Sequence, residues 1–161
     1  VVQRILREAV EAQCTMAAME VSSIGLALHR VDMIPFSVGV FTNLSQDHLD
    51  FHGDMNQYLE AKARLFQELM DPEGTAIVNA DDPSSHRIQP QCAHIWTYGH
   101  GPNHDFQLEK RQLDLQGCMG IVSTPQGYAK LKIPLIVNNG IIIANIFKVL
   151  FATFLILSLL M

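Results

Sequence analysis

Residues 41–53 read Phe-Thr-Asn-Leu-Ser-Gln-Asp-His-Leu-Asp-Phe-His-Gly, and residues 60–66 read Glu-Ala-Lys-Ala-Arg-Leu-Phe. The first four of these residues are the end of a largely apolar run, residues 37–44, which is typical of a strand covered on both faces. The chain then enters a loop crowded with Asn, Asp and His, and continues into a helix whose lysine, Lys62, we expect one turn or so from its start. Because open α/β sheets bind ligands beyond the carboxyl ends of their strands, we predict the functional site here.

The remaining patterns predict an α/β fold: a mostly parallel sheet flanked by helices, with a small antiparallel subsheet. Helical periodicity marks residues 1–13, 24–30 and 55–70, and apolar runs mark strands at 15–21, 37–44, 75–78 and 93–98. Residues 79–83, Asn-Ala-Asp-Asp-Pro, place a second polar loop at the same edge of the sheet as residues 45–53. Between residues 105 and 135, two-residue alternation and turn glycines predict the antiparallel strands.

Composition bounds the function. A chain of 161 residues is long enough for one domain with a real core. The net charge of −5 and the lack of a Lys/Arg-rich stripe argue against nucleic acid as a partner. Three widely spaced cysteines, Cys14, Cys92 and Cys118, read as buried free thiols of a reducing compartment, and we expect a cytoplasmic location.

The two ends of the chain are unusual. The sequence begins without Met, in what reads as the middle of a helix, so we expect a piece of a longer protein. Residues 141–161 carry one charge, Lys148, over a length that suits a membrane span. Three interpretations compete for this apolar segment: a tail anchor, a core helix without its covering partner, or sequence outside the original reading frame. The absence of basic flanks and of an aromatic belt argues against the anchor. We favour the third interpretation, because the sequence pattern described below is lost after Ile136 and Ile, Phe and Leu then dominate to the end.

Several residues near the predicted loop could ligate a metal. Mg²⁺ takes oxygen ligands, keeps several waters and needs only one or two protein groups, a role that suits Glu20 and His48. Zinc is the weaker alternative, because His48 and His52 fall in a glycine-terminated loop rather than on a helix, and His52 reads equally well as a surface or loop-capping residue. For Lys62 the residue types alone favour an ordinary ion pair.

Four ordered motifs carry a resemblance to a known family. They are Met19-Glu-Val-Ser-Ser-Ile-Gly-Leu-Ala-Leu-His-Arg30, Val40-Phe-Thr-Asn-Leu-Ser-Gln-Asp-His-Leu-Asp-Phe-His-Gly53, Glu60-Ala-Lys-Ala-Arg-Leu-Phe66 and Ile77-Val-Asn-Ala-Asp-Asp82. Together they resemble the central, ATP-binding domain of the Mur ligases, and most of all the branch that adds diaminopimelate or lysine as third residue to UDP-N-acetylmuramoyl-alanyl-glutamate. The likeness covers residues 1–135, which we expect to be a partial central domain, and leaves residues 136–161 outside it.

The resemblance implies a mechanism and roles for residues. In this family ATP phosphorylates the substrate's terminal carboxylate, and the amine of the incoming amino acid attacks the acyl phosphate. Glu20 and His48 match magnesium ligands of the family. Lys62 matches a lysine that captures CO2 and holds a second Mg²⁺ as its carbamate, so the resemblance gives Lys62 and His48 catalytic roles. Ser22 and Arg30 match positions that contact the UDP-muramoyl substrate, where an arginine suits a phosphate or carboxylate.

The sequence departs from the family pattern at several places. The phosphate-binding loop, expected upstream, is absent, so no ATP-phosphate residues can be assigned and we expect the isolated chain to be inactive. Ile24 stands where histidine is usual, and Leu28 where glutamine is common. After Ile136 the chain reads Val-Asn-Asn-Gly instead of the family's Gly-x-Phe-Asn motif.

Two other functions stay open at this point. The chain could persist as a non-catalytic binding or scaffold protein, tethered to a membrane through residues 141–161. A folate-adding ligase of the same superfamily would share the fold and the carbamate, although the Asp47–Gly53 run favours the muramyl branch.

Overall fold

The computed structural model describes residues 1–100, 103–114 and 117–133. It contains helices α1 (Val2–Glu11), α2 (Ser23–Ala27), α3 (Leu49–His52), α4 (Met55–Glu68) and the 3-10 turn η1 (Ser85–Arg87). Its strands are β1 (Phe36–Phe41), β2 (Met70–Asn79), β3 (His94–Gly99), β4 (Phe106–Asp114), β5 (Gly117–Thr124) and β6 (Gly127–Ile133). The apolar segment 141–161, and with it the membrane-anchor interpretation, lies outside the described residues, within which no helix is long and apolar enough to cross a membrane.

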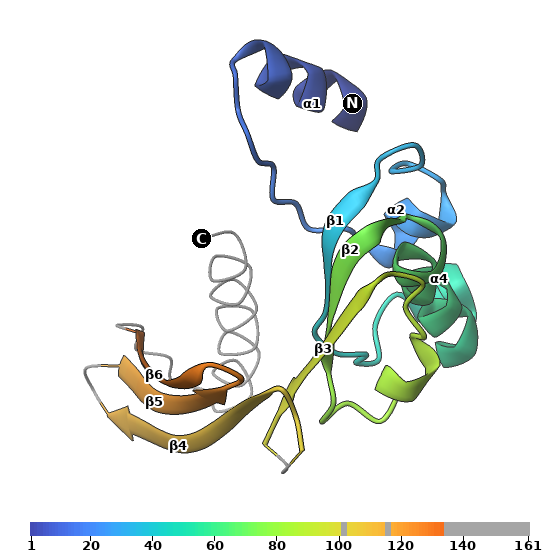
Figure 1. Ribbon diagram of the computed structural model, residues 1–161. Helices are drawn as coiled ribbons and strands as arrows, with labels where there is room; N and C mark the ends of the chain where they lie inside the picture. Colours follow the sequence, from blue (N-terminus) through green and yellow to red (C-terminus); the bar gives the residue numbers. More distant parts are fainter. Residues whose placement is uncertain (101–102, 115–116, 134–161) are drawn as a thin grey trace.

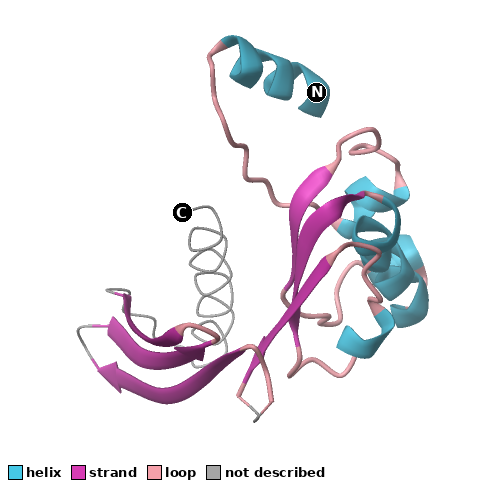
Figure 2. Ribbon diagram, in the orientation of Figure 1, coloured by secondary structure: helices cyan, strands magenta, loops and turns pink. Residues whose placement is uncertain are grey.

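The strands form one mixed sheet in the order β1-β2-β3-β4-β5-β6 (Figures 1 and 2). Strands β1 to β4 pair in parallel, whereas β4, β5 and β6 pair antiparallel. The predicted fold class is therefore confirmed, with one refinement: the antiparallel strands continue the parallel sheet instead of forming a separate unit beside it. Strand β4 pairs with β3 at only two positions, and then leads away from the parallel part (Figure 1).

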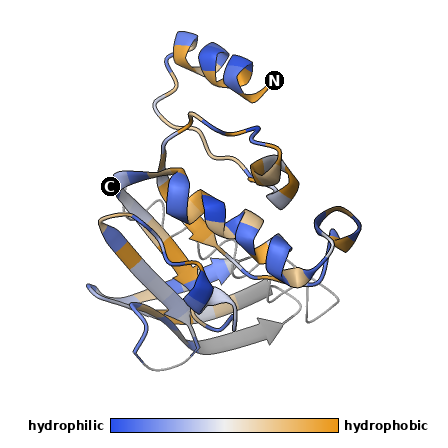
Figure 3. Cartoon of the chain, turned by 90° about the vertical axis from the view of Figure 1, so that its right-hand side faces the viewer, coloured by the Kyte–Doolittle hydropathy of each residue, from blue (hydrophilic) through white to orange (hydrophobic). Residues whose placement is uncertain are grey.

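The main core lies between the sheet and α4. It consists of the buried residues Phe41, Leu59, Ala63, Phe66, Ala76, Val78 and Ile88. The apolar positions of α4 recur at helical spacing, so one side of this helix faces β1 and β2 while its polar side stays outside (Figure 3). Asp54 fixes where α4 begins, because its carboxylate accepts hydrogen bonds from the backbone N–H groups of Asn56 and Gln57 at 2.8 and 2.9 Å.

Three local predictions were wrong. Residues 15–21 form no strand, and residues 12–20 are exposed. This run is rich in Ala and Met, which pair poorly in strands, and no strand of the described sheet offers it hydrogen bonds. Cys14 is exposed rather than buried, and Cys92 is half-buried. Within the predicted loop 45–53, α3 forms one helical turn that ends at Gly53, whose φ of 82° favours glycine.

Candidate functional site

The loops after β1 and β2 lie together as the sequence predicts, and we call residues 42–48 and 79–84, which include the last residue of β2, the rim loops. The side-chain amide of Asn79 donates to the carbonyl oxygen of Thr42 at 2.6 Å. The buried carboxylate of Asp82 accepts from the backbone N–H groups of Leu44 and Ser84, each at 2.8 Å. Parallel pairing of β1 with β2 brings the two strand ends side by side, and these bonds hold the loops to each other.

Lys62 lies on α4 facing the rim loops. It is the eighth residue of the helix, so it lies about two turns from the start instead of one. Burial lowers the pKa of Lys62, although Glu20, Asp47 and Asp82 are close enough to oppose that change by attracting its charge. A lowered pKa leaves more of the amine neutral near pH 7, and only a neutral amine can act as a nucleophile toward CO2.

His48 and Lys62 meet at one aromatic ring. The ring of Tyr58 lies with its centroid 5.2 Å from Lys62 Nζ, and the His48 ring stands edge-to-face to it at 6.2 Å. His48 precedes α3 as its N-cap in a left-handed conformation, with φ of 54°, and its backbone N–H donates to Asp47 Oδ1 at 2.8 Å. The structure thus brings Glu20, His48 and Lys62 to one region.

His52 is neither an exposed loop residue nor an evident zinc ligand, the two environments expected for it. It is buried, its Nε2 lies 2.9 Å from the Ser23 hydroxyl, and its ring stacks on Tyr58 at 5.1 Å. Burial lowers the pKa of His52, and nearby His48 adds to this. His52 is therefore packed between α2 and α4, and its Nε2 is already engaged by the Ser23 hydroxyl, an arrangement that does not favour a shared zinc site.

The donors around Lys62 fit Mg²⁺ better than zinc. Among the described residues, no group of three or more His, Cys, Asp or Glu side chains is arranged to hold a metal ion. Mg²⁺ needs no such closed set, since it retains waters and shares substrate phosphates. Glu20 and His48 are exposed and can offer an oxygen and a nitrogen, although His48 Nε2 also lies 3.6 Å from Asp47 Oδ2, whereas both carboxylate oxygens of Asp82 already accept backbone hydrogen bonds.

Ser22 and Arg30, the two predicted substrate contacts, lie at opposite ends of α2. Ser22 is exposed and caps this helix, because its hydroxyl accepts from the Gly25 N–H at 3.0 Å. Arg30 is exposed beyond the other end of α2.

Comparison with known proteins agrees with this geometry. Residues 1–152 match the Mur ligase middle domain. The chain belongs to the Mur ligase family. A UDP-N-acetylmuramoyl-L-alanyl-D-glutamate–2,6-diaminopimelate ligase from Gloeobacter violaceus is 44% identical over 138 residues, which are 84% of this chain and 27% of that protein. The chain therefore spans about a quarter of the length of this Mur ligase.

Solved structures of Mur ligases share the fold. The structure of a UDP-N-acetylmuramoyl-L-alanyl-D-glutamate–2,6-diaminopimelate ligase superposes with a TM-score of 0.80 and 29% identity, over 94% of this chain and 31% of that one. The MurF ligase from Thermotoga maritima, solved in complex with ADP, gives a TM-score of 0.59 at 19% identity, over 80% of this chain and 30% of that one. The second likeness concerns the fold alone.

Sequence reasoning missed the residues that surround the predicted ligands. Tyr58 was not singled out, although it lies four residues before Lys62 and therefore on the same helix face. The second contact is between the Ser23 hydroxyl and His52 Nε2, which lie 2.9 Å apart. The spacing of Tyr58 and Lys62 could have revealed the first contact, whereas no local pattern reveals the second.

Proposed function

We propose that this chain is the middle-domain part of an ATP-dependent ligase that adds diaminopimelate to UDP-N-acetylmuramoyl-alanyl-glutamate in the cytoplasm, during synthesis of the peptidoglycan precursor. The observation that carries the proposal is the meeting of His48 and Lys62 at Tyr58, with Glu20 close by, in a chain 44% identical to a protein named for that reaction. Binding of ADP by a Mur ligase of the same fold supports ATP as the phosphoryl donor.

Lys62 is the centre of the proposed chemistry. Its neutral amine attacks the carbon of CO2, a new N–C bond forms, and a proton leaves the nitrogen to give an anionic carbamate. An ammonium cannot ligate a metal, but the carbamate oxygens can. Burial favours the neutral amine by lowering the pKa of Lys62, while Glu20, Asp47 and Asp82 oppose that change. The Lys62 side chain therefore goes from a positively charged ammonium, through the neutral amine, to a negatively charged carbamate that can ligate a metal.

Glu20, His48 and the carbamate of Lys62 would hold Mg²⁺, which neutralises the charge that develops on the phosphoryl oxygens. The phosphoryl group passes to the substrate's carboxylate, and the amine of diaminopimelate then displaces phosphate to form the amide. Ser22 and Arg30 would contact the UDP-muramoyl substrate, with the Arg30 guanidinium suited to a phosphate or carboxylate.

A chimeric enzyme tests the proposal. Residues 1–152 replace the corresponding segment of the Gloeobacter violaceus ligase, and ADP release is measured with UDP-N-acetylmuramoyl-alanyl-glutamate and either diaminopimelate or lysine. We expect activity with diaminopimelate, and a kcat lowered by at least about 100-fold in Lys62→Ala, because phosphoryl transfer depends on the cation clamp. Lys130→Ala, which removes an exposed lysine on β6, serves as the control and should leave kcat unchanged. Full activity of the Lys62→Ala chimera would refute the proposal.

A further inference from the structure

The Tyr58 ring joins the two side chains on which the proposed function depends. Lys62 Nζ lies 5.2 Å from its centroid, at the distance of a cation–π contact. His48, which comes from the rim loops, meets the same ring edge-to-face, with 87° between the planes. Because one ring touches both, a shift of Tyr58 would change the separation of His48 and Lys62.

Buried neighbours fix the ring itself. His52 stacks on Tyr58 with 25° between the planes and is in turn held by the Ser23 hydroxyl at 2.9 Å. The exposed fractions are 5% for Tyr58, 6% for His52 and 2% for Ser23. Phe51 meets the other ring of this stack, His52, edge-to-face at 4.9 Å. The support therefore runs from α2 through α3 to α4.

We propose that Tyr58 is a positioning residue that sets the placement of Lys62 and His48 before any ligand binds. The proposal rests on the proposed function of those two residues. A lysine side chain on a helix has many accessible rotamers, and ordering it costs conformational entropy. A rigid ring that restricts these rotamers before ligands bind reduces the entropy that is lost on binding. The ring lies at cation–π distance from the Lys62 ammonium, while the edge-to-face contact restrains the His48 ring.

The first experiment needs neither metal nor nucleotide. In the NMR spectrum of the 161-residue chain, ring current from Tyr58 should move the ε-methylene protons of Lys62 upfield of those of the exposed Lys130. Tyr58→Phe keeps the ring and should preserve the shift, whereas Tyr58→Leu should abolish it. An unshifted Lys62 signal in the unmodified chain would overturn the proposal without reference to any variant's folding.

The second experiment measures the consequence in the chimeric ligase. The MgCl2 concentration for half-maximal rate should rise about 10- to 100-fold in Tyr58→Leu, the usual cost of removing a residue that orients metal ligands, and stay near its starting value in Tyr58→Phe. Circular dichroism confirms that each variant is folded. An unchanged MgCl2 requirement in folded Tyr58→Leu would overturn the positioning role. Full activity of the Lys62→Ala chimera would instead refute the proposed function. It would not affect the ring-current shift of Lys62 in the unmodified chain, so the two failures can be told apart.

Discussion

Helices α1 and α4 have the same kind of sequence pattern and opposite environments. Both are amphipathic, and each carries an Arg–Glu pair four residues apart: Arg7 with Glu11 at 2.7 Å, and Arg64 with Glu68 at 2.6 Å. Helix α4 buries Tyr58, Leu59, Ala63 and Phe66, whereas α1 has no buried residue. Figure 1 shows α4 against the sheet and α1 apart from it at the N-terminus.

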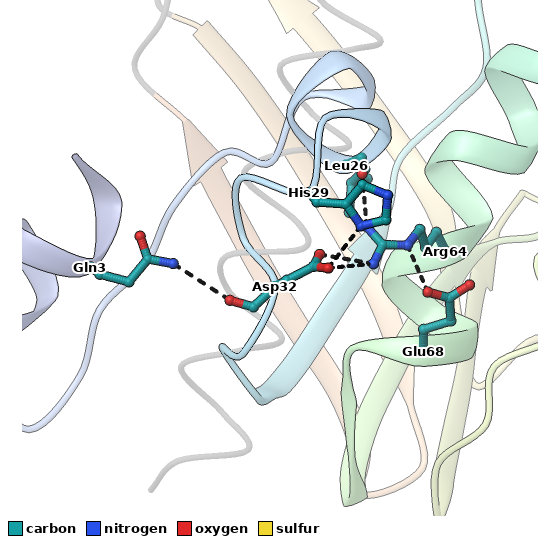
Figure 4. A network of polar contacts seen from close by, with 6 residues as sticks. All are labelled: Gln3, Leu26, His29, Asp32, Arg64 and Glu68. Carbon is teal, nitrogen blue, oxygen red and sulfur yellow. Dashed lines mark hydrogen bonds and ion pairs between the residues drawn. The ribbon is translucent and has the colours of Figure 1, made fainter.

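The difference lies in what each arginine reaches beyond its own helix. Figure 4 shows Arg64 in a network across α2, α4 and the loop after α2, where α1 contributes one long hydrogen bond, from Gln3 Nε2 to the Asp32 carbonyl oxygen at 3.5 Å. Its Nη1 donates to the Leu26 carbonyl oxygen at 2.7 Å, and its Nη2 lies 2.8 Å from Oδ1 and 2.9 Å from Oδ2 of Asp32. Arg7, by contrast, is exposed. An amphipathic pattern thus predicts a helix, but contacts with other elements decide its contribution to stability.

The largest effect should come from truncating the buried face of α4. Phe66 is 2% exposed in the main core, so Phe66→Ala should lower the free energy of unfolding by about 3–5 kcal/mol through lost burial and a cavity. The matched change on α1 is Ile5→Ala, whose side chain is 54% exposed and which should change that free energy by less than about 0.5 kcal/mol. Urea unfolding of the two variants measures both values. Equal losses would show that α1 is packed as tightly as α4.

An intermediate effect should follow removal of the two arginines. Arg64→Ala leaves the Leu26 carbonyl and the Asp32 carboxylate without their partner and should cost about 1–3 kcal/mol. Arg7→Ala removes only an exposed pair within one helix and should cost about 0.3–0.5 kcal/mol. The same urea titrations compare them. If Arg7→Ala proved as costly as Arg64→Ala, the contacts between elements would not be the source of the difference.

The smallest effect should be a dependence of stability on pH. The hydrogen bond from His29 and then the contacts with Arg64 hold the pKa of Asp32 below its usual value. A depressed carboxyl pKa contributes stability that is present above the unfolded value, near 3.8, and is lost as pH falls through the folded value. Asp32→Asn should therefore flatten the fall in stability below about pH 4. Unfolding curves that decline identically in both proteins would contradict this.

Much of the architecture could be predicted from the sequence. Apolar runs in β1 and β2, followed by polar residues, correctly indicated parallel strands whose carboxyl ends meet, because a continuous apolar run is a strong local signal of a strand in a parallel sheet. The hydrogen bonds of Asn79 and Asp82 with the loop after β1 show that the two strand ends lie together. Alternation over residues 105–135 likewise gave the antiparallel strands.

The parts that failed depend on distant partners. Residues 15–21 have the apolar character of a strand, but a strand exists only where a neighbour supplies hydrogen bonds. His52 looked like a surface residue because its partner, Ser23, is 29 residues away. The roles given to Glu20, Ser22, Arg30, His48 and Lys62 remain proposals, since they came from the resemblance and concern ligands rather than folding.

Carbamate formation on Lys62 is the most direct test of the account. The chain is equilibrated with ¹³C-bicarbonate at mildly alkaline pH, and its carbonyl region is recorded by ¹³C NMR. We predict a carbamate resonance that disappears in Lys62→Ala and persists in Lys130→Ala, because burial lowers the pKa of Lys62 and so favours its neutral amine. A spectrum without that resonance, or one in which it survives Lys62→Ala, would contradict the account.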